Sequence, residues 1–263
     1  MDAAKELELF GYTKINNIVS EETCAILADR FDEIEKKRRD AGNLYTPGGQ
    51  TVIYNAHLED PDLFLPMIDI PEVLAVVEKV LGPNFILDTC AGSRSSVAEG
   101  KFGPHIDGHL PISDFAQTTD VQMLICLDPF TETNGSTKVW PLSHKTGIRI
   151  HGTDWYKEQM PQPVVLSAPR GTLVMFLGQT WHQIGLNVDN TRRWGLILQY
   201  RRWWMKPSFD YTKCGEAIFN KLNDTQKKLL GFTSRPPASA DTRIKTIMDI
   251  NNLPKTYKEA IEC

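Results

Sequence analysis

The feature of the sequence that most restricts the fold is a series of short apolar or alternating runs in the middle of the chain. Runs of this length, separated by glycine, proline, asparagine and aspartate, predict β-strands. No stretch with a helical period lies between them, which disfavours a parallel β-α-β sheet and favours an antiparallel barrel or sandwich. The predicted strands are residues 85–89, 121–127, 137–140, 164–166, 172–177 and 194–200.

Helices are predicted on both sides of this region. Ser20 precedes two glutamates, and apolar residues then recur at three- and four-residue steps, so an amphipathic helix begins at this cap. A second helix starts at a proline and ends before Gly82 and Pro83, a pair that stops helices. The predicted fold is mainly β (α+β), a jelly roll buttressed by N- and C-terminal helices. The predicted helical segments are residues 20–39, Pro71–Leu81, residues 223–231 and a stretch near Ile247, with a loop at residues 235–237.

The length of 263 residues is near the upper limit that one hydrophobic core supports, and no low-complexity stretch divides the chain. We therefore expect one domain over residues 1–263. Residues 41–50 are rich in turn formers and lack any period, so we expect a mobile surface loop there, able to cover a pocket.

Charge and cysteine content restrict the partners and the compartment. A formal net charge of −4 gives no general attraction for nucleic acid or for an anionic membrane. Five widely spaced cysteines without a C-x-x-C pair indicate free thiols in a reducing compartment. No run approaches the roughly 18 apolar residues that span a bilayer. We expect a cytoplasmic protein that acts on a small molecule and binds neither nucleic acid nor membrane, and homo-oligomer formation stays open.

Two segments contain candidate metal ligands. His105 and Asp107 are two residues apart, hence on one face if the backbone is extended, and His182 follows a predicted strand. Two imidazoles and one carboxylate form the facial triad of non-haem iron(II) oxygenases, which leaves three coordination positions open. The His-x-Asp pair alone does not establish a metal site, because His105 can equally form a hydrogen bond in a turn.

Arg193 favours the metal site over a hydrogen bond of His105 in a turn. It lies eleven residues after His182, and a guanidinium can bind the distal carboxylate of 2-oxoglutarate through two parallel hydrogen bonds while the keto-acid end chelates iron. Arg192 competes for this role, but neighbouring residues on a strand face opposite sides. The spacing favours Arg193, and we expect Arg192 to face solvent or to form ion pairs.

Three blocks of sequence resemble the phytanoyl-CoA dioxygenase family, and the resemblance covers roughly residues 80–205. The first is His105–Asp107, and the second runs from an Asn-Gly turn at Asn134 into Pro-Leu-Ser-His. The third runs from His182 to Arg193. One departure is Leu142, where the family usually has a glycine, which questions the shape of that turn.

The resemblance implies a double-stranded β-helix (jelly roll, cupin-like) as the core, with helical additions at residues 1–80 and 206–263. It implies that His105, Asp107 and His182 bind Fe(II), that Arg193 anchors 2-oxoglutarate, and that O2 is the third reactant. It also points to Thr137 and Gln122 as further cosubstrate-binding residues. His109, Trp203 and Trp204 are the candidates for contact with substrate, His109 by alternation from the ligands and the tryptophans by following the last strand.

The expected function is an Fe(II)- and 2-oxoglutarate-dependent dioxygenase, an oxidoreductase that hydroxylates, desaturates, epoxidises or rearranges its substrate. A small, mostly apolar intermediate of natural-product biosynthesis is the expected substrate. Asp107 disfavours halogenation, because the related iron halogenases lack this carboxylate. Two alternatives stay open: a non-redox metal-binding β-barrel protein, and a catalytically inactive interaction module of the same fold.

Overall fold

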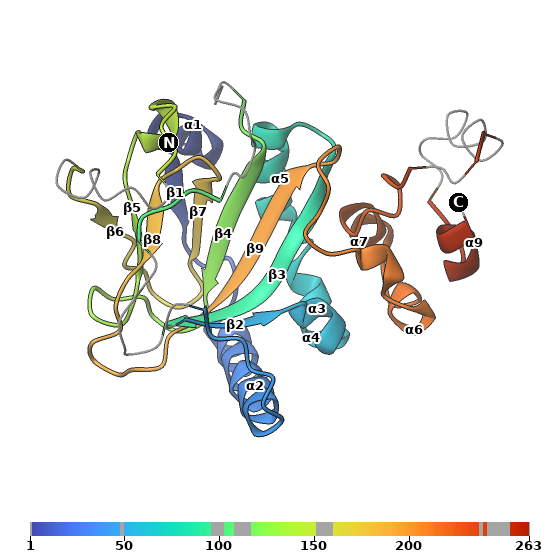
Figure 1. Ribbon diagram of the computed structural model, residues 1–263, viewed down its shortest axis with the longest axis horizontal. Coiled ribbons are helices and arrows are strands. Elements are labelled where there is room, and N and C mark those ends of the chain that lie inside the picture. The colour runs from blue at the N-terminus through green and yellow to red at the C-terminus, as the bar shows by residue number, and fades with distance from the viewer. Residues whose placement is uncertain are drawn as a thin grey trace.

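The computed structural model consists of two antiparallel sheets with helices on one side (Figure 1). It describes residues 2–47, 50–95, 103–107, 117–150, 160–236, 239–240 and 253–262. The larger sheet has six strands in the order β1 (Tyr12–Ile15), β7 (Leu173–Leu177), β4 (Asp120–Cys126), β9 (Trp194–Arg202), β3 (Phe85–Ser95) and β2 (Gln50–Tyr54). The smaller sheet has the order β6 (Val164–Val165), β5 (Thr137–Val139) and β8 (His182–Ile184).

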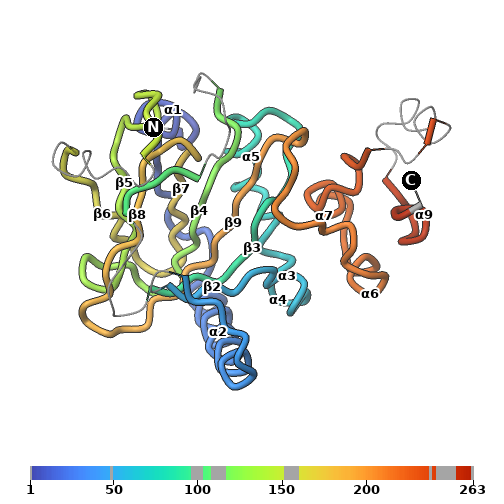
Figure 2. The backbone as a smooth tube through the Cα atoms, in the orientation of Figure 1, coloured from blue at the N-terminus to red at the C-terminus, as the bar shows by residue number. Residues whose placement is uncertain are grey.

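The helices lie mainly before β3 and after β9 along the chain. Figure 2 shows α6 and α7 beside β3, with α9 beyond them. The N-terminal helices are α1 (Ala3–Phe10), α2 (Glu21–Asp40), α3 (Ala56–Glu59), α4 (Pro61–Phe64), the 3-10 turn η2 (Leu65–Met67) and α5 (Pro71–Leu81). The later ones are η3 (Ser143–Lys145), η5 (Tyr211–Lys213), α6 (Glu216–Phe219), α7 (Asp224–Leu229) and α9 (Tyr257–Glu262).

Alternation along β4 explains how the larger sheet is buried on both faces. Val121, Met123 and Ile125 lie on the face of the sheet that packs against the helices, in the main core that they share with apolar residues of α1, α2 and α5. Leu124 points the other way and packs with Val139 of the smaller sheet. Burial of each such side chain contributes about 1.5–3 kcal/mol relative to exposure, so both faces of the sheet stabilise the fold.

Helix α2 is fixed against the sheet by aromatic contacts. The side chain of Ser20 accepts a hydrogen bond from a backbone N–H of the first turn, as the sequence predicts. Phe31 stacks on Trp194 at the start of β9, with ring centroids 5.2 Å apart. A side chain at Gly92 would collide with the ring of Phe31, so this position on β3 requires glycine.

The antiparallel, helix-buttressed jelly roll expected from the sequence is confirmed, and each of the six predicted strands is present. Three strands were not predicted, namely β1, β2 and β8. The predicted helices at residues 20–39, 71–81 and 223–231 correspond to α2, α5 and α7, whereas the one near Ile247 lies outside the described residues. Gln50, expected to be the last residue of the loop at residues 41–50, already pairs with β3.

A bulge in β3 alters which residues face the space between the sheets. The register against β9 shifts between Leu87 and Thr89, which leaves Asp88 as the extra residue. Consecutive residues of a regular strand point to opposite faces, but a bulge re-aims one of them. Asp88 and Thr89 therefore both line the same cavity.

The turn at Leu142 keeps the shape that a glycine would give it. Leu142 has φ 66° and ψ −4°, in the left-handed region, and its backbone N–H donates to the carbonyl of Phe10. A left-handed residue with a side chain costs on the order of 1–2 kcal/mol. The departure from the family pattern therefore changes the strain of this turn and not its conformation.

The described part of the chain contains no helix that is long and apolar enough to cross a membrane. Its cysteines are free thiols: Cys24, Cys90 and Cys126 are buried and Cys214 is partly buried.

Candidate metal and cosubstrate site

Two segments from different parts of the chain meet to form the candidate metal centre. The backbone N–H of His105 donates to the carbonyl of His182 at 3.0 Å, and the reverse hydrogen bond is 2.9 Å long. The N–H of Asp107 donates to the carbonyl of Gly178 at 3.1 Å. This short antiparallel bridge places three side chains on one side of the backbone. The sequence prediction that His105 and Asp107 share a face agrees with this geometry, and the bridge brings His182 to them from a distant segment.

Hydrogen bonds to backbone carbonyls set the tautomer of both histidines. Nδ1 of His105 is 3.1 Å from the carbonyl oxygen of Gly103, and Nδ1 of His182 is 3.0 Å from that of Thr180. A carbonyl only accepts, so each Nδ1 carries the proton. The lone pair of each Nε2 is then available to a metal ion, an arrangement that metal-binding histidines commonly use.

The three ligand atoms are close enough to hold one ion. Nε2 of His182 is 3.4 Å from Oδ2 of Asp107, Nε2 of His105 is 3.9 Å from Oδ1, and all three ligand atoms lie within 4.8 Å of one another. Burial lowers the pKa of His182 to about 4, so this imidazole is neutral near pH 7. Two neutral imidazoles and a carboxylate are the donor set that Fe(II) takes in facial-triad sites, so the residues fit the ion.

Arg193 is a fully buried cation on the wall of the same cavity. Its guanidinium lies 3.8 Å from the ring centroid of Phe130, and Nη2 donates to Oγ1 of Thr137 at 3.4 Å. Nε and Nη1 are buried and have no hydrogen-bond partner. Burial lowers the pKa of Arg193 to about 10, which still leaves it charged at neutral pH. A buried charge with open donors is costly unless an anion pairs with it, and the distal carboxylate of 2-oxoglutarate fits this requirement.

Arg192 forms the ion pairs expected of it. Its guanidinium contacts the carboxylates of Asp29, Asp32 and Asp128 at 2.6, 3.0 and 3.1 Å. These contacts tie the start of β9 to α2, and the alternation along the chain directs the neighbouring Arg193 to the opposite side.

A cavity of about 370 Å³ joins the ligand triad to Arg193. Thr137 and Gln122, the two further cosubstrate candidates, both line it, and Oε1 of Gln122 is buried without a hydrogen-bond partner. Six of the residues singled out from the sequence therefore surround one space: His105, Asp107, Gln122, Thr137, His182 and Arg193.

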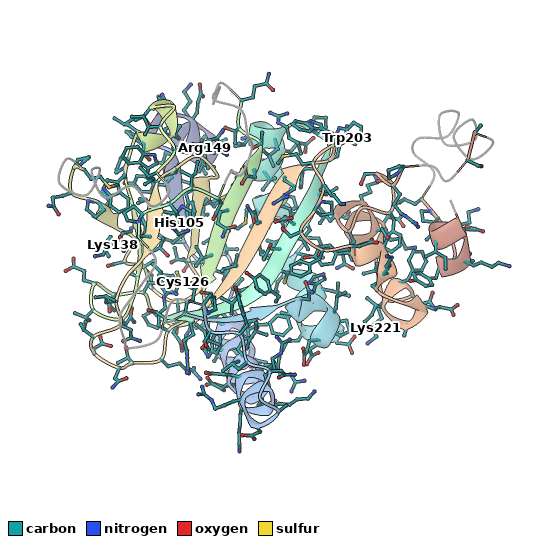
Figure 3. All side chains as sticks on the ribbon, in the orientation of Figure 1. His105, Cys126, Lys138, Arg149, Trp203 and Lys221 are labelled. Atoms are coloured by element: carbon teal, nitrogen blue, oxygen red, sulfur yellow. The ribbon has the colours of Figure 1, made fainter. Side chains whose placement is uncertain are left out.

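The expectation that Trp203 or Trp204 overhangs the open coordination positions is corrected by the structure. Both side chains are about half exposed, and neither is among the described residues that line the cavity. In Figure 3 Trp203 lies at the end of the larger sheet near the C-terminal helices, away from His105. The strand continues to Arg202, two residues further than predicted, and carries the tryptophans past the cavity. His109 lies outside the described residues.

Residues that follow the tryptophans reach the cavity instead. Ser208 and Phe209 line it, and so do three side chains that sequence reasoning missed on other elements: Asp88, Gln199 and Arg201. Alternation from Arg193 along β9 is a signal that could have found Gln199 and Arg201. Asp88 faces inward only because of the bulge in β3.

One histidine and one tryptophan near the site serve in packing. His144 is buried, and its Nε2 lies 3.2 Å from the carbonyl oxygen of Glu8. Trp140 packs with Trp181 and Ile106 in a small cluster behind the metal ligands. This cluster is an apolar support for the strand that carries His182.

Comparison with known proteins assigns the family. The sequence profile of phytanoyl-CoA dioxygenase matches residues 7–194, which is more than half of the chain. The chain belongs to the phytanoyl-CoA dioxygenase family. Members of this family use Fe(II), 2-oxoglutarate and O2, and this chain has the His-Asp-His set that such a centre needs.

Two curated relatives match most of the chain, and solved structures share its fold. Uncharacterized proteins of Mycobacterium tuberculosis and Mycobacterium bovis are each 26% identical over 248 residues, which covers 89% of this chain and 88% of theirs. The epimerase SnoN, solved with Fe3+, alpha-ketoglutarate and nogalamycin RO, has a TM-score of 0.61 at 16% identity and covers 85% of this chain and 90% of its own. EctD from S. alaskensis with bound Fe has a TM-score of 0.62 at 19% identity over 78% of both chains. At these identities the likeness of the two structures to this chain shows a shared fold and nothing beyond it.

Proposed function

We propose that the chain is an Fe(II)- and 2-oxoglutarate-dependent dioxygenase that oxidises a small molecule, and that His105, Asp107, His182 and Arg193 are the residues that make it one. The observation that supports this most directly is the fully buried Arg193, whose Nε and Nη1 lack partners on the wall of the cavity that also contains the triad. A metal-binding protein without an anionic cosubstrate has no use for an unpaired buried cation at this place.

Each residue has a defined task in this proposal. His105, Asp107 and His182 hold the ion on one face, and the carbonyls at their Nδ1 atoms keep both imidazoles in the ligating tautomer. Arg193 and Thr137 bind the distal carboxylate and so orient the cosubstrate. When bound, iron and 2-oxoglutarate supply an oxidation in which R–H, O2 and 2-oxoglutarate give R–OH, succinate and carbon dioxide. The protein binds, orients and excludes bulk water from the cavity.

Desaturation, epoxidation and rearrangement belong to the same proposal, since they differ in how the substrate is held. Asp107 occupies the position that iron halogenases leave for chloride, which supports oxygenation over halogenation. A natural-product intermediate as substrate is consistent with the family.

The decisive experiment is a spectrum of the anaerobic protein with Fe(II) and 2-oxoglutarate. We expect a weak visible charge-transfer band from the chelated keto acid. Variants His105→Ala and Asp107→Ala should lose both the band and succinate formation while their circular dichroism stays unchanged. Absence of the band in the unmodified protein, together with tight zinc binding, would favour the non-redox metal-binding alternative.

A further inference from the structure

The floor of the cavity changes from apolar to polar along β9. Ile197, four residues after Arg193, lies beside Leu124, so the strip next to the cosubstrate end is apolar. The next pair across the same two strands is Gln199 beside Gln122, and Thr89 lies on the other side of Gln199. The substrate end of the floor therefore presents hydrogen-bonding groups.

This polar strip lies at the level of the metal ligands. Phe176 on β7 is paired with Gln122 at the edge of this strip, and the centroid of its ring is 4.5 Å from that of His182. The part of a substrate nearest the metal centre is consequently next to amide and hydroxyl groups. An apolar substrate would leave these groups unpaired on binding, at a cost of about 1–3 kcal/mol for each one buried.

The amide of Gln199 is held in one orientation. Its Nε2 donates to Oδ2 of Asp120 at 3.1 Å, and Asp120 also accepts from Oγ1 of Thr119 at 2.8 Å. One N–H of the amide is thus committed to the carboxylate behind the floor, and this fixes the carbonyl oxygen as an acceptor for a ligand. A carbonyl oxygen accepts hydrogen bonds, so it selects ligand groups that donate, such as hydroxyls.

A fixed ion pair closes the outer end of the floor. Nη2 of Arg201 is 2.6 Å from Oδ2 of Asp88, and Nη1 donates to the carbonyl of Lys206 at 2.8 Å. The backbone N–H of Ser208 donates to Oδ1 of Asp88 at 2.6 Å. Nε of Arg201 is buried without a hydrogen-bond partner. The pair therefore offers one donor in a preset position and carries no net charge.

The charges of the loaded cavity cancel as well. If the proposed function holds, the charge of Fe(II) with Asp107 is opposite and equal to that of Arg193 with the 2-oxoglutarate dianion. The Asp88–Arg201 pair adds nothing to this balance. A neutral ligand then binds without adding an uncompensated charge to the cavity, whereas a charged ligand adds one.

Aromatic rings form the wall above this polar floor. The rings of Tyr54 and Phe209 are 5.4 Å apart between centroids, those of Tyr45 and Tyr54 are 6.0 Å apart, and all three residues line the cavity. Flat aromatic faces match the C–H face of a saturated ring, while its edge hydroxyls can reach the floor. The cavity of about 370 Å³ must also hold the cosubstrate, which restricts the ligand to about one ring.

From these features we infer that the substrate is a neutral polyhydroxylated ring, of the size of one hexose or cyclitol unit. The inference rests on the proposed function for the position of the metal and the cosubstrate. Hydroxyls of the ring contact Gln199 and Arg201, and its C–H face lies against Tyr54 and Phe209. This replaces the mostly apolar substrate that the sequence alone led us to expect.

The test compares matched rings on the intact protein loaded with zinc and 2-oxoglutarate, which does not turn over. Saturation-transfer NMR is recorded with myo-inositol and methyl glucopyranoside, and with cyclohexanol and cyclohexanemethanol as six-membered rings that have a single hydroxyl. We expect saturation transfer to the two polyols at concentrations where the two apolar rings show none.

Variants locate the binding. Gln199→Leu and Tyr54→Leu should each raise the Kd of the bound polyol about three- to tenfold, the effect of one lost neutral hydrogen bond or one lost ring contact. Gln162→Leu makes the same change as the first variant at an exposed position outside the cavity and should leave Kd unchanged. The Fe(II)–2-oxoglutarate band, measured on each variant, reports whether the metal centre is intact.

The outcomes separate the two proposals. Absence of the Fe(II)–2-oxoglutarate band in the unmodified protein contradicts the proposed function. If the band is normal, three results overturn the inference on the substrate alone. These are tighter binding of the apolar rings, no binding of either polyol, and an unchanged Kd in both cavity variants.

Discussion

Replacement of Arg193 by methionine should stabilise the protein and at the same time remove its response to 2-oxoglutarate. Burial lowers the pKa of this guanidinium well below its ordinary range, to about 10. At 1.36 kcal/mol for each pKa unit, the charged form is disfavoured by roughly 3 kcal/mol in the folded protein. Methionine has a similar length and no charge, so the substitution relieves this cost.

The sign of the effect follows from the two pKa values. Below pH 10 both the folded and the unfolded chain carry the proton on Arg193, so the full penalty is present at neutral pH. The penalty disappears only as the pH rises from about 10 toward the ordinary pKa of arginine, because the folded state loses the proton first. The cation–π contact with Phe130 offsets part of the penalty, by about 1–2 kcal/mol. The expected net gain of the Arg193→Met variant without ligand is therefore about 1–2 kcal/mol, or roughly 2–8 °C in Tm.

Ligand binding has the opposite consequence for the two proteins. For the unmodified protein, 2-oxoglutarate at a hundred times its Kd adds about 2.7 kcal/mol of stability. The variant should gain none at the same concentration. Thermal unfolding with zinc bound, with and without 2-oxoglutarate, measures both effects, and Lys228→Met provides a cation-to-methionine control at an exposed position of α7. A variant that keeps its 2-oxoglutarate response, or that melts well below the unmodified protein without ligand, would refute the reasoning.

Three further predictions concern the scaffold. Gly178→Ala places a methyl group against the buried carboxylate of Asp120, so the backbone that holds the second iron ligand must move; we expect a loss of about 1–3 kcal/mol in urea unfolding and weaker metal binding by titration. Arg192→Ala removes a partner of the buried Asp128, so the free energy of unfolding should fall by about 1–3 kcal/mol, while an altered KM for 2-oxoglutarate would contradict its assignment as an ion-pair residue. Burial lowers the pKa of His57 to about 4, so the unfolded chain is protonated first as the pH falls below 6.5 and stability is lost toward pH 4. His57→Leu should therefore remove roughly 2 kcal/mol of the stability difference between pH 8 and pH 5 in denaturant titrations, and an unchanged pH slope would count against a buried neutral imidazole.

Residues close in sequence, or related by strand alternation, were predictable from the sequence. His105 and Asp107 share a face because an extended backbone requires it, and the choice of Arg193 over Arg192 follows from the same rule. The meeting of this pair with His182 depends on a bridge of two hydrogen bonds between distant segments, which the family resemblance indicated and local patterns did not.

Other features depend on contacts that no local pattern contains. The strand at residues 50–54 was not predicted, because its pairing partner in β3 is about forty residues away and the segment just before it is rich in turn formers. The inward position of Asp88 results from a bulge, which shifts register without any signal in residue type. Trp203 and Trp204 were assigned to the cavity from their place after the last strand, and two more residues of pairing to Arg202 move them beyond it.

Strand β9 has a consequence for how this protein can acquire new substrates. Arg193 and Arg201 stand eight residues apart, so the backbone spaces the proposed cosubstrate anchor from the proposed substrate contact by at most about 26 Å at 3.3 Å for each residue. Under both proposals, substitutions at Gln199 or Arg201 change which substrate is bound without disturbing the cosubstrate site. Insertion or deletion of one residue within the strand would instead turn every following side chain to the opposite face and separate the two functions. We therefore expect new substrate specificities in this fold to arise by exchange of side chains along β9, while the length of the strand stays constant.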